Sequence, residues 1–130
     1  MDNPDLSKKR SFVLEDEPSI TRVLQRVLKG MGFTVDAAAN GLIAQGMLEH
    51  QDYDLIIFDL RTPQMNGKEL FLWLRDKYPE KAEKVVFTSG DTVSGNTQSF
   101  LEQSGRPFIP KPFTPDELRT VVNQTLERAG

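Results

Sequence analysis

Residues able to bind a metal ion or a phosphoryl group follow four short apolar segments of this 130-residue sequence. Each segment has the length and composition of a buried strand. The polar residues at their ends are three adjacent acids, a lone aspartate, a threonine–serine pair and a lysine, namely Glu15, Asp16, Glu17, Asp59, Thr88, Ser89 and Lys111. If the segments are parallel strands of one sheet, these side chains meet at one edge, where such sheets bind their ligands.

The three adjacent acids require an explanation, because like charges repel one another and the preceding residues 12–14 are apolar. A divalent cation among them would offset the repulsion. The chain has no cysteine and a single histidine, so the ligands are oxygen atoms, which favours a hard ion such as Mg²⁺. A carboxylate can act as a nucleophile toward a phosphoryl group and form an aspartyl phosphate. A metal ion, a lysine and a hydroxyl around one aspartate supply the positioning and charge neutralisation that this transfer needs.

Each of these residues, taken alone, also has an ordinary structural explanation. Glu17 is equally well a solvated loop residue, Asp59 a turn residue and Lys111 a surface lysine. Taken together, the polar groups follow four predicted strands in order, one group at each strand end. This joint pattern favours one shared site over four unrelated surface positions.

Apolar residues recur at two spacings along the chain. Continuous runs predict strands, and spacings of three and four residues predict amphipathic helices between them. The expected strands are residues 12–14, 33–35, 55–58, 85–87 and 108–109. The expected helices are residues 20–31, a segment capped by Asn40, residues 70–78, a short, loosely packed helix within 92–105, and a segment that begins after Thr114. This alternation predicts a doubly wound α/β fold with a five-stranded parallel sheet and helices on both faces.

A few single residues carry separate expectations. His50 is expected on the surface of its helix. The helix capped by Asn40 is expected to pack through Leu42, Ile43, Met47 and Leu48. Trp73, in the helix over residues 70–78, is expected to pack against a neighbouring element.

Composition narrows the classes of protein to consider. A net charge of −3 argues against a broad nucleic-acid surface, which needs concentrated positive charge. No apolar stretch approaches the roughly 20 residues of a membrane helix, and the N-terminus lacks a signal-peptide core. The absence of cysteine excludes disulfides and fits an intracellular protein. We therefore expect a polar tail over residues 1–9 and one cytoplasmic domain over residues 10–130, with no nucleic-acid or membrane partner.

The order and spacing of the motifs resemble the response-regulator receiver domain of two-component signalling. The resemblance extends from residue 10 to residue 128. Its markers are Glu15-Asp16-Glu17, Asp59 followed by Pro63-Gln64-Met65-Asn66-Gly67, Thr88-Ser89-Gly90, and Phe108-Ile109-Pro110-Lys111-Pro112-Phe113. It implies a flavodoxin-like sheet with strand order 2-1-3-4-5 and a cis peptide bond between Lys111 and Pro112. Residues 105–108 are also similar to receivers attached to hybrid histidine kinases.

The resemblance implies a phosphoacceptor site. Asp59 would take a phosphoryl group from the phosphohistidine of a partner kinase, as one step of a phosphorelay. Mg²⁺ would be held by Asp16, Asp59 and the backbone carbonyl of Arg61. Glu15, one methylene longer than the aspartate common at that position, would act through a metal-bound water. Lys111 would pair with the phosphate.

The resemblance also implies a conformational switch. Thr88 would donate its hydroxyl to the phosphoryl group, and Phe108 would be the aromatic residue that rotates inward. Ser89 is small, which leaves the usual room beside the phosphate.

Three positions depart from, or vary within, the pattern of the family. Thr62, just before Pro63, stands where methionine is common. Arg61 lies two residues after the acceptor and Gly90 two residues after the switch hydroxyl, and both positions would flank the hydrolytic water. We therefore expect Arg61 and Gly90 to tune dephosphorylation.

The expected partners follow from the same resemblance. A sensor histidine kinase or a phosphotransfer protein would donate the phosphoryl group, and a downstream protein would bind the face made by the fourth helix, fifth strand and fifth helix. Homodimer formation is left open. The chain would be a signalling domain and not an enzyme, catalysing only its own phosphorylation and dephosphorylation.

Other functions remain alternatives at this point. The main one is a receiver-like interaction module that docks without being phosphorylated. A small Mg²⁺-dependent phosphatase would need a second carboxylate close after the nucleophile, where Arg61 stands, and a cap domain. A dinucleotide-binding domain would need a Gly-x-Gly-x-x-Gly motif after the first strand, where Asp16-Glu17-Pro18 stands.

Overall fold

The computed structural model describes residues 9–90 and 95–129 of the chain. Strands and helices alternate along these ranges as β1 (Lys9–Leu14), α2 (Pro18–Gly30), β2 (Phe33–Ala38), α3 (Gly41–His50), β3 (Leu55–Asp59), α4 (Gly67–Lys77), α5 (Pro79–Ala82), β4 (Val85–Ser89), α6 (Gly95–Ser104), β5 (Phe108–Pro110) and α7 (Pro115–Ala129). Residues 1–8, most of the expected polar tail, lie outside the described residues.

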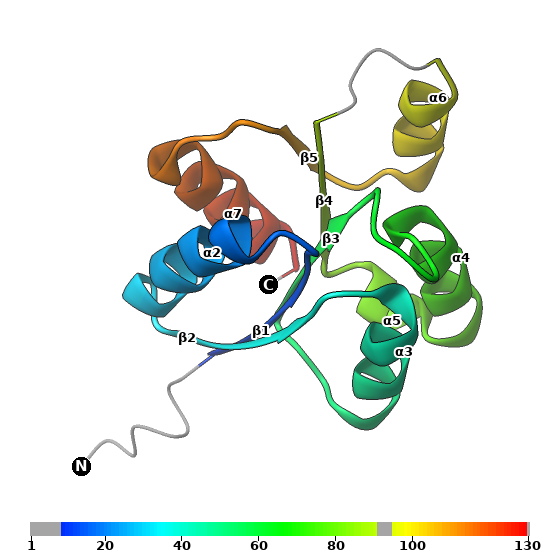
Figure 1. Ribbon diagram of the computed structural model, residues 1–130, viewed down its shortest axis with the longest axis horizontal. Coiled ribbons are helices and arrows are strands. Elements are labelled where there is room, and N and C mark those ends of the chain that lie inside the picture. The colour runs from blue at the N-terminus through cyan, green and yellow to red at the C-terminus, as the bar shows by residue number, and fades with distance from the viewer. Residues whose placement is uncertain (1–8, 91–94, 130) are drawn as a thin grey trace.

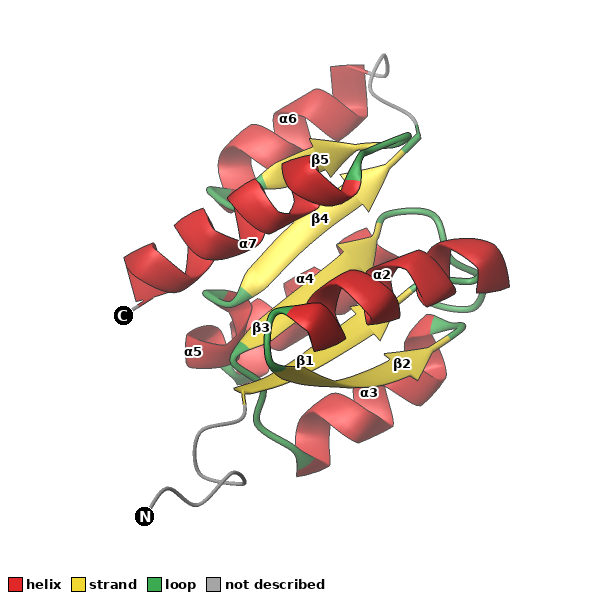
Figure 2. Cartoon of the chain, turned by 90° about the vertical axis from the view of Figure 1, so that its left-hand side faces the viewer, coloured by secondary structure: helices red, strands yellow, loops and turns green. Residues whose placement is uncertain are grey.

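The strands form one sheet with the order β2-β1-β3-β4-β5, and all of the neighbouring strands are parallel. Figure 2 shows the strand arrows pointing the same way, so their carboxyl ends share one edge of the sheet. The predicted doubly wound fold and strand order are therefore confirmed. The chain reverses its direction of winding at β1 and β3, which places the crevice for ligands between these two strands.

Helices cover both faces of the sheet (Figures 1 and 2). On one face, α2 and α7 bury a cluster that contains Leu24, Leu28, Leu118 and Val122. On the other face, α3, α4, α5 and α6 bury a second cluster rich in aromatic residues. β3 lies between the two layers and is buried along its whole length, which explains its continuously apolar sequence.

Helix α3 is rotated differently from the prediction. Its buried residues are Gly41, Ala44 and Leu48, spaced three and four apart. The expectation for Ile43 and Leu42 was wrong, since Ile43 is 55% exposed and Leu42 is 53% exposed. A helix with apolar residues on several sides can bury any of them, so its neighbours decide which side packs inward. In α3 the inward side carries the small residues Gly41 and Ala44 together with Leu48.

Other local predictions agree with the structure. His50 is exposed, as expected, and its Nδ1 lies 2.8 Å from the carbonyl of Gly46. Trp73 is half-buried and packs edge-on against Tyr78 at 5.8 Å between ring centroids. The expected helix before residue 105 is present as α6, whose buried residue is Phe100. Helix α5 was not predicted, although Pro79 at its first position is a common helix start.

Candidate functional site

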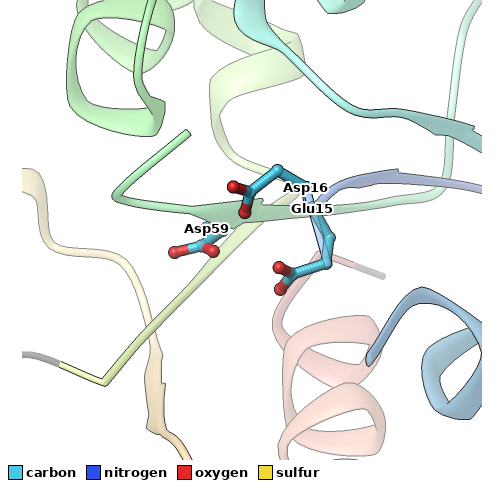
Figure 3. A group of neighbouring side chains, drawn as sticks. All are labelled: Glu15, Asp16 and Asp59. Atoms are coloured by element: carbon cyan, nitrogen blue, oxygen red, sulfur yellow. The ribbon is translucent and has the colours of Figure 1, made fainter. Parts of the chain in front are cut away.

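The predicted site residues are brought together by strand register. Asp59 ends β3 and lies beside Thr88 of β4. β1 ends at Leu14 beside Phe58, so Glu15 and Asp16 emerge next to Asp59. Figure 3 shows the three carboxylates gathered beyond the ends of β1 and β3.

Three of these side chains form a buried ion cluster. Nζ of Lys111 lies 2.7 Å from Oε1 of Glu15 and 2.9 Å from Oδ2 of Asp59. Glu15 is 3% exposed and Asp59 is 4% exposed, so neither carboxylate is well solvated. The lysine therefore supplies the positive charge that two buried carboxylates require. Its position follows from β5, because the backbone N–H of Lys111 donates to the carbonyl of Ser89 at 3.0 Å.

The burial of this cluster shifts the pKa of two groups. Loss of solvation raises the pKa of Glu15, against the lowering effect of its hydrogen bonds to Lys111 and the backbone N–H of Glu17. For Lys111, burial alone would lower the pKa, but hydrogen bonds to Glu15 and Asp59 outweigh burial and raise it. The lysine therefore stays protonated at neutral pH.

The acidic residues fit a hard divalent cation. One carboxylate oxygen from each of Glu15, Asp16 and Asp59 lies within 4.8 Å of the others. Asp16 is exposed at the mouth of the group, whereas Glu15 and Asp59 are buried beneath it. All of the donors are oxygen atoms, which is the ligand chemistry of Mg²⁺ and Ca²⁺. A cleft of ≈ 490 Å³, lined by Asp16, Asp59 and Lys111 among others, opens over the group and leaves room for water ligands and a phosphoryl group.

The two hydroxyl residues lie on the far side of Asp59 from the acids. Thr88 and Ser89 are buried at the end of β4. Within the part of the chain that the structure describes, Oγ1 of Thr88 is buried and has no hydrogen-bond partner. Such an unsatisfied hydroxyl is rare in a protein interior and identifies a place where a ligand oxygen or a rearrangement would supply the missing bond.

The remaining predicted residues surround this centre. Arg61 is exposed, and its backbone N–H donates to Oδ1 of Asp59 at 3.1 Å. Gly90 is exposed, and among the described residues no atom beyond its chain neighbours lies within 4 Å of where its Cβ would be. Phe108 is half-buried against the aromatic cluster. The peptide bond between Lys111 and Pro112 is cis, as the resemblance implied.

Two glycines also shape the site: the sequence analysis named Gly67 only as part of a marker and gave Gly41 no role. Gly67 begins α4, and a Cβ there would lie 2.9 Å from the carbonyl carbon of Asp59. Gly41 begins α3 and lies against the loop between β3 and α4. Their signal in the sequence is weak, because glycine is common at helix ends and turns.

Comparison with known proteins identifies the family. Residues 12–123 match the response regulator receiver domain. The chain belongs to this family. It is a receiver domain of two-component response regulators, which makes it a signalling domain.

Individual receiver proteins are similar along almost the whole chain. Response regulator Rre1 of Synechocystis is 32% identical over 90% of this chain and 51% of its own length. Sensor kinase CckA of Brucella abortus is 32% identical over 95% of this chain and 13% of its own length. A CheY-like receiver domain protein from Methanospirillum hungatei has a solved structure with a TM-score of 0.86 and 25% identity, which covers 95% of this chain and 97% of that chain.

The receiver spans about half or less of the curated relatives described above. These relatives include both a response regulator and a sensor kinase. Among residues 9–90 and 95–129, no helix is long and apolar enough to cross a membrane.

Proposed function

We propose that this receiver accepts a phosphoryl group on Asp59 from the phosphohistidine of a sensor kinase or phosphotransfer protein. The observation that carries the proposal is that the Asp59 carboxylate belongs to a group of three acids and also contacts the Lys111 ammonium at 2.9 Å. The acids suit a metal ion, and the ammonium suits a phosphoryl oxygen. Membership of the receiver family supports the same function.

The chemistry is a transfer between two nucleophiles. A carboxylate oxygen of Asp59 attacks phosphorus as the phosphorus–nitrogen bond of the phosphohistidine breaks. The electron pair of that bond stays on the imidazole, and Asp59 becomes an acyl phosphate. Lys111 neutralises charge on the phosphoryl oxygens, while the Arg61 N–H orients the attacking carboxylate through its 3.1 Å hydrogen bond.

Mg²⁺ is the proposed cofactor. Asp16, Asp59 and the backbone carbonyl of Arg61 would hold it, with Glu15 acting through water. Glu15 is engaged by Lys111 at 2.7 Å, and its buried position beneath Asp16 supports this indirect role. When bound, the ion would neutralise charge on the transferred phosphoryl group.

Phosphorylation would switch the fold at β4 and β5. The hydroxyl of Thr88, which has no hydrogen-bond partner among the described residues, would bond to a phosphoryl oxygen beside the small side chain of Ser89. Phe108 would then rotate inward, and α6 would repack with β5 and α7 to present a face to a downstream protein. α6 suits this movement because its buried apolar residue is Phe100 alone among residues 95–104.

Dephosphorylation would depend on two residues at the mouth of the cleft. Arg61 is large and cationic, whereas Gly90, which lines the same cleft, has no side chain. We expect each to change the lifetime of the acyl phosphate, because the hydrolytic water must approach between them.

The proposal is tested by incubation with Mg²⁺ and acetyl phosphate, followed at once by intact mass spectrometry. We expect one added phosphoryl group in the unchanged protein and in the control Asp52→Asn, since Asp52 has a 95% exposed side chain away from the cleft. Asp59→Asn should gain none. No gain in any protein, or an equal gain in Asp59→Asn, would instead favour an interaction module that works without phosphorylation.

A further inference from the structure

Helix α3 touches the loop that follows the phosphoacceptor. A Cβ on Gly41 would lie 2.6 Å from both the carbonyl carbon and the Cβ of Met65, with the carbonyl oxygen of Met65 closer still. Only a glycine lets the two backbones approach this closely. The Gly41 N–H also donates to the carbonyl of Pro63 at 3.4 Å. Gly41 is buried at this contact, 18 positions before Asp59 in the chain.

The loop itself adopts a conformation that needs support. Gln64 has φ of 60° and Met65 has φ of 110°, both in a region that residues with side chains rarely adopt. The hydroxyl of Thr62 donates to the carbonyl of Met65 at 3.4 Å, and Thr62 is buried. The Met65 carbonyl is therefore held between the Thr62 hydroxyl and the backbone of Gly41.

The same loop reaches the reaction centre. Its first part contains Arg61, whose N–H holds Oδ1 of Asp59 at 3.1 Å. The proposed function also assigns the Arg61 carbonyl to the metal. A displacement of Met65 would therefore move both groups, because Arg61 lies four residues earlier in a tightly folded loop.

We propose that Gly41 and Thr62 are positioning residues for the metal and the phosphoacceptor. Gly41 has no side chain, so α3 can approach the β3–α4 loop closely enough to support Met65. Thr62 supports the same residue through its hydroxyl group. Neither residue touches the reacting atoms. This inference rests on the proposed function and extends it to an element, α3, that contributes no side chain to the site.

The test compares the same substitution at two positions of α3. Gly41→Ala places a methyl group against Met65, whereas Gly46→Ala adds one that meets, within 4 Å, no described atom beyond its chain neighbours and the backbone of its own helix. The protein is titrated with MgCl₂ and followed by two-dimensional NMR at a temperature where each variant is folded. We expect Gly41→Ala to weaken Mg²⁺ binding roughly 10-fold to 100-fold, as changes to residues that support metal ligands usually do. Gly46→Ala should stay within about twofold.

Thr62→Val provides a second variant that keeps the shape of the side chain and removes its hydroxyl. We expect it to weaken Mg²⁺ binding about 10-fold. In both loop variants, acetyl phosphate labelling of Asp59 should recover when the concentration of Mg²⁺ is raised in proportion. If Gly41 and Thr62 only stabilised the fold, their substitution would lower the midpoint of thermal unfolding without changing the concentration of Mg²⁺ that half-saturates the folded protein.

The outcomes separate this inference from the proposed function. If the unchanged protein neither binds Mg²⁺ nor gains a phosphoryl group, the proposed function fails. If the unchanged protein does both, and the folded Gly41→Ala and Thr62→Val proteins bind Mg²⁺ as tightly as Gly46→Ala, the positioning role is wrong. If Gly41→Ala does not fold, the Thr62→Val titration alone decides.

Discussion

Replacing Lys111 by methionine removes the cation that contacts both buried carboxylates of the site. The lysine side chain is 15% exposed, that of Asp59 is 5% exposed and that of Glu15 is fully buried. Methionine keeps most of the apolar stem, so the variant isolates the charge. Glu15 and Asp59 would then face each other without compensation in a region of poor solvation.

The expected loss of stability is large for one side chain. Removing one partner of a buried ion pair commonly costs about 3–5 kcal/mol, because the other charge is left buried and unpaired. In the variant, a buried carboxyl group can take up a proton and so avoid being charged. This limits the loss of stability, because each unit by which its pKa is raised costs only about 1.4 kcal/mol of folding free energy. We therefore expect a decrease of about 3 kcal/mol in the free energy of unfolding for Lys111→Met at pH 8 without divalent cations.

The loss should depend on pH with a definite sign. Burial already raises the pKa of Glu15, and removal of the ammonium would raise it further. A carboxyl group whose pKa is higher in the folded state stabilises folding below its unfolded pKa, and this contribution is lost as pH rises through the folded pKa. The difference between Lys111→Met and the unchanged protein should thus be smallest near about pH 4 to 5 and grow above the ordinary carboxyl range.

Urea unfolding in EDTA measures these differences, with the fluorescence of Trp73, the single tryptophan, and circular dichroism as probes. Lys77→Met serves as a control, because Lys77 pairs with Glu49 at 3.1 Å on the surface and should matter far less. At ten times its dissociation constant for Lys111→Met, Mg²⁺ should stabilise that variant by about 1.4 kcal/mol, and the same concentration should stabilise the unchanged protein less. A loss below about 1 kcal/mol at pH 8, or one that does not change with pH, would refute the assignment of Lys111 as the required counter-charge.

Three further substitutions, two of them with a comparison variant, test interactions that stabilise the fold, each by urea unfolding. Asn66→Ala removes a capping box at the start of α4, where Asn66 and Glu69 exchange hydrogen bonds of 2.9 and 3.2 Å, and should lower the free energy of unfolding by about 1 kcal/mol. Asn66→Asp should retain most of the stability, because aspartate also caps helices well. Tyr53→Phe loses the 2.7 Å hydrogen bond to Asp36 and should cost about 1 kcal/mol; an unchanged free energy would show that the bond adds nothing over solvation. Leu48→Ala opens a cavity under α3 and should cost about 2–5 kcal/mol, whereas the exposed Leu42→Ala should cost little.

Much of the fold and of the site could be predicted from local sequence. The apolar run at residues 55–58 predicts a strand buried on both sides, and β3 confirms it. Because parallel strands end at one edge, placing Asp59, Thr88 and Lys111 at strand ends was sufficient to predict that they meet. These inferences succeed because periodicity and chain direction depend only on residues near one another in the chain.

Tertiary structure alone decided the features that depend on distant segments. The outward rotation of Ile43 follows from small residues of α3 packing on the molecule, and the helical pattern did not reveal it. The pairing of Glu15 with Lys111 requires the ends of β1 and β5 to meet at one cleft. There, Nζ of Lys111 lies 2.7 Å from Oε1 of Glu15. The close approach of Gly41 to Met65 likewise joins α3 to the β3–α4 loop. The sequence by itself thus determined which chemical groups are present and at which edge, while the three-dimensional packing decided which of them touch, because contact energies act between atoms and not along the chain.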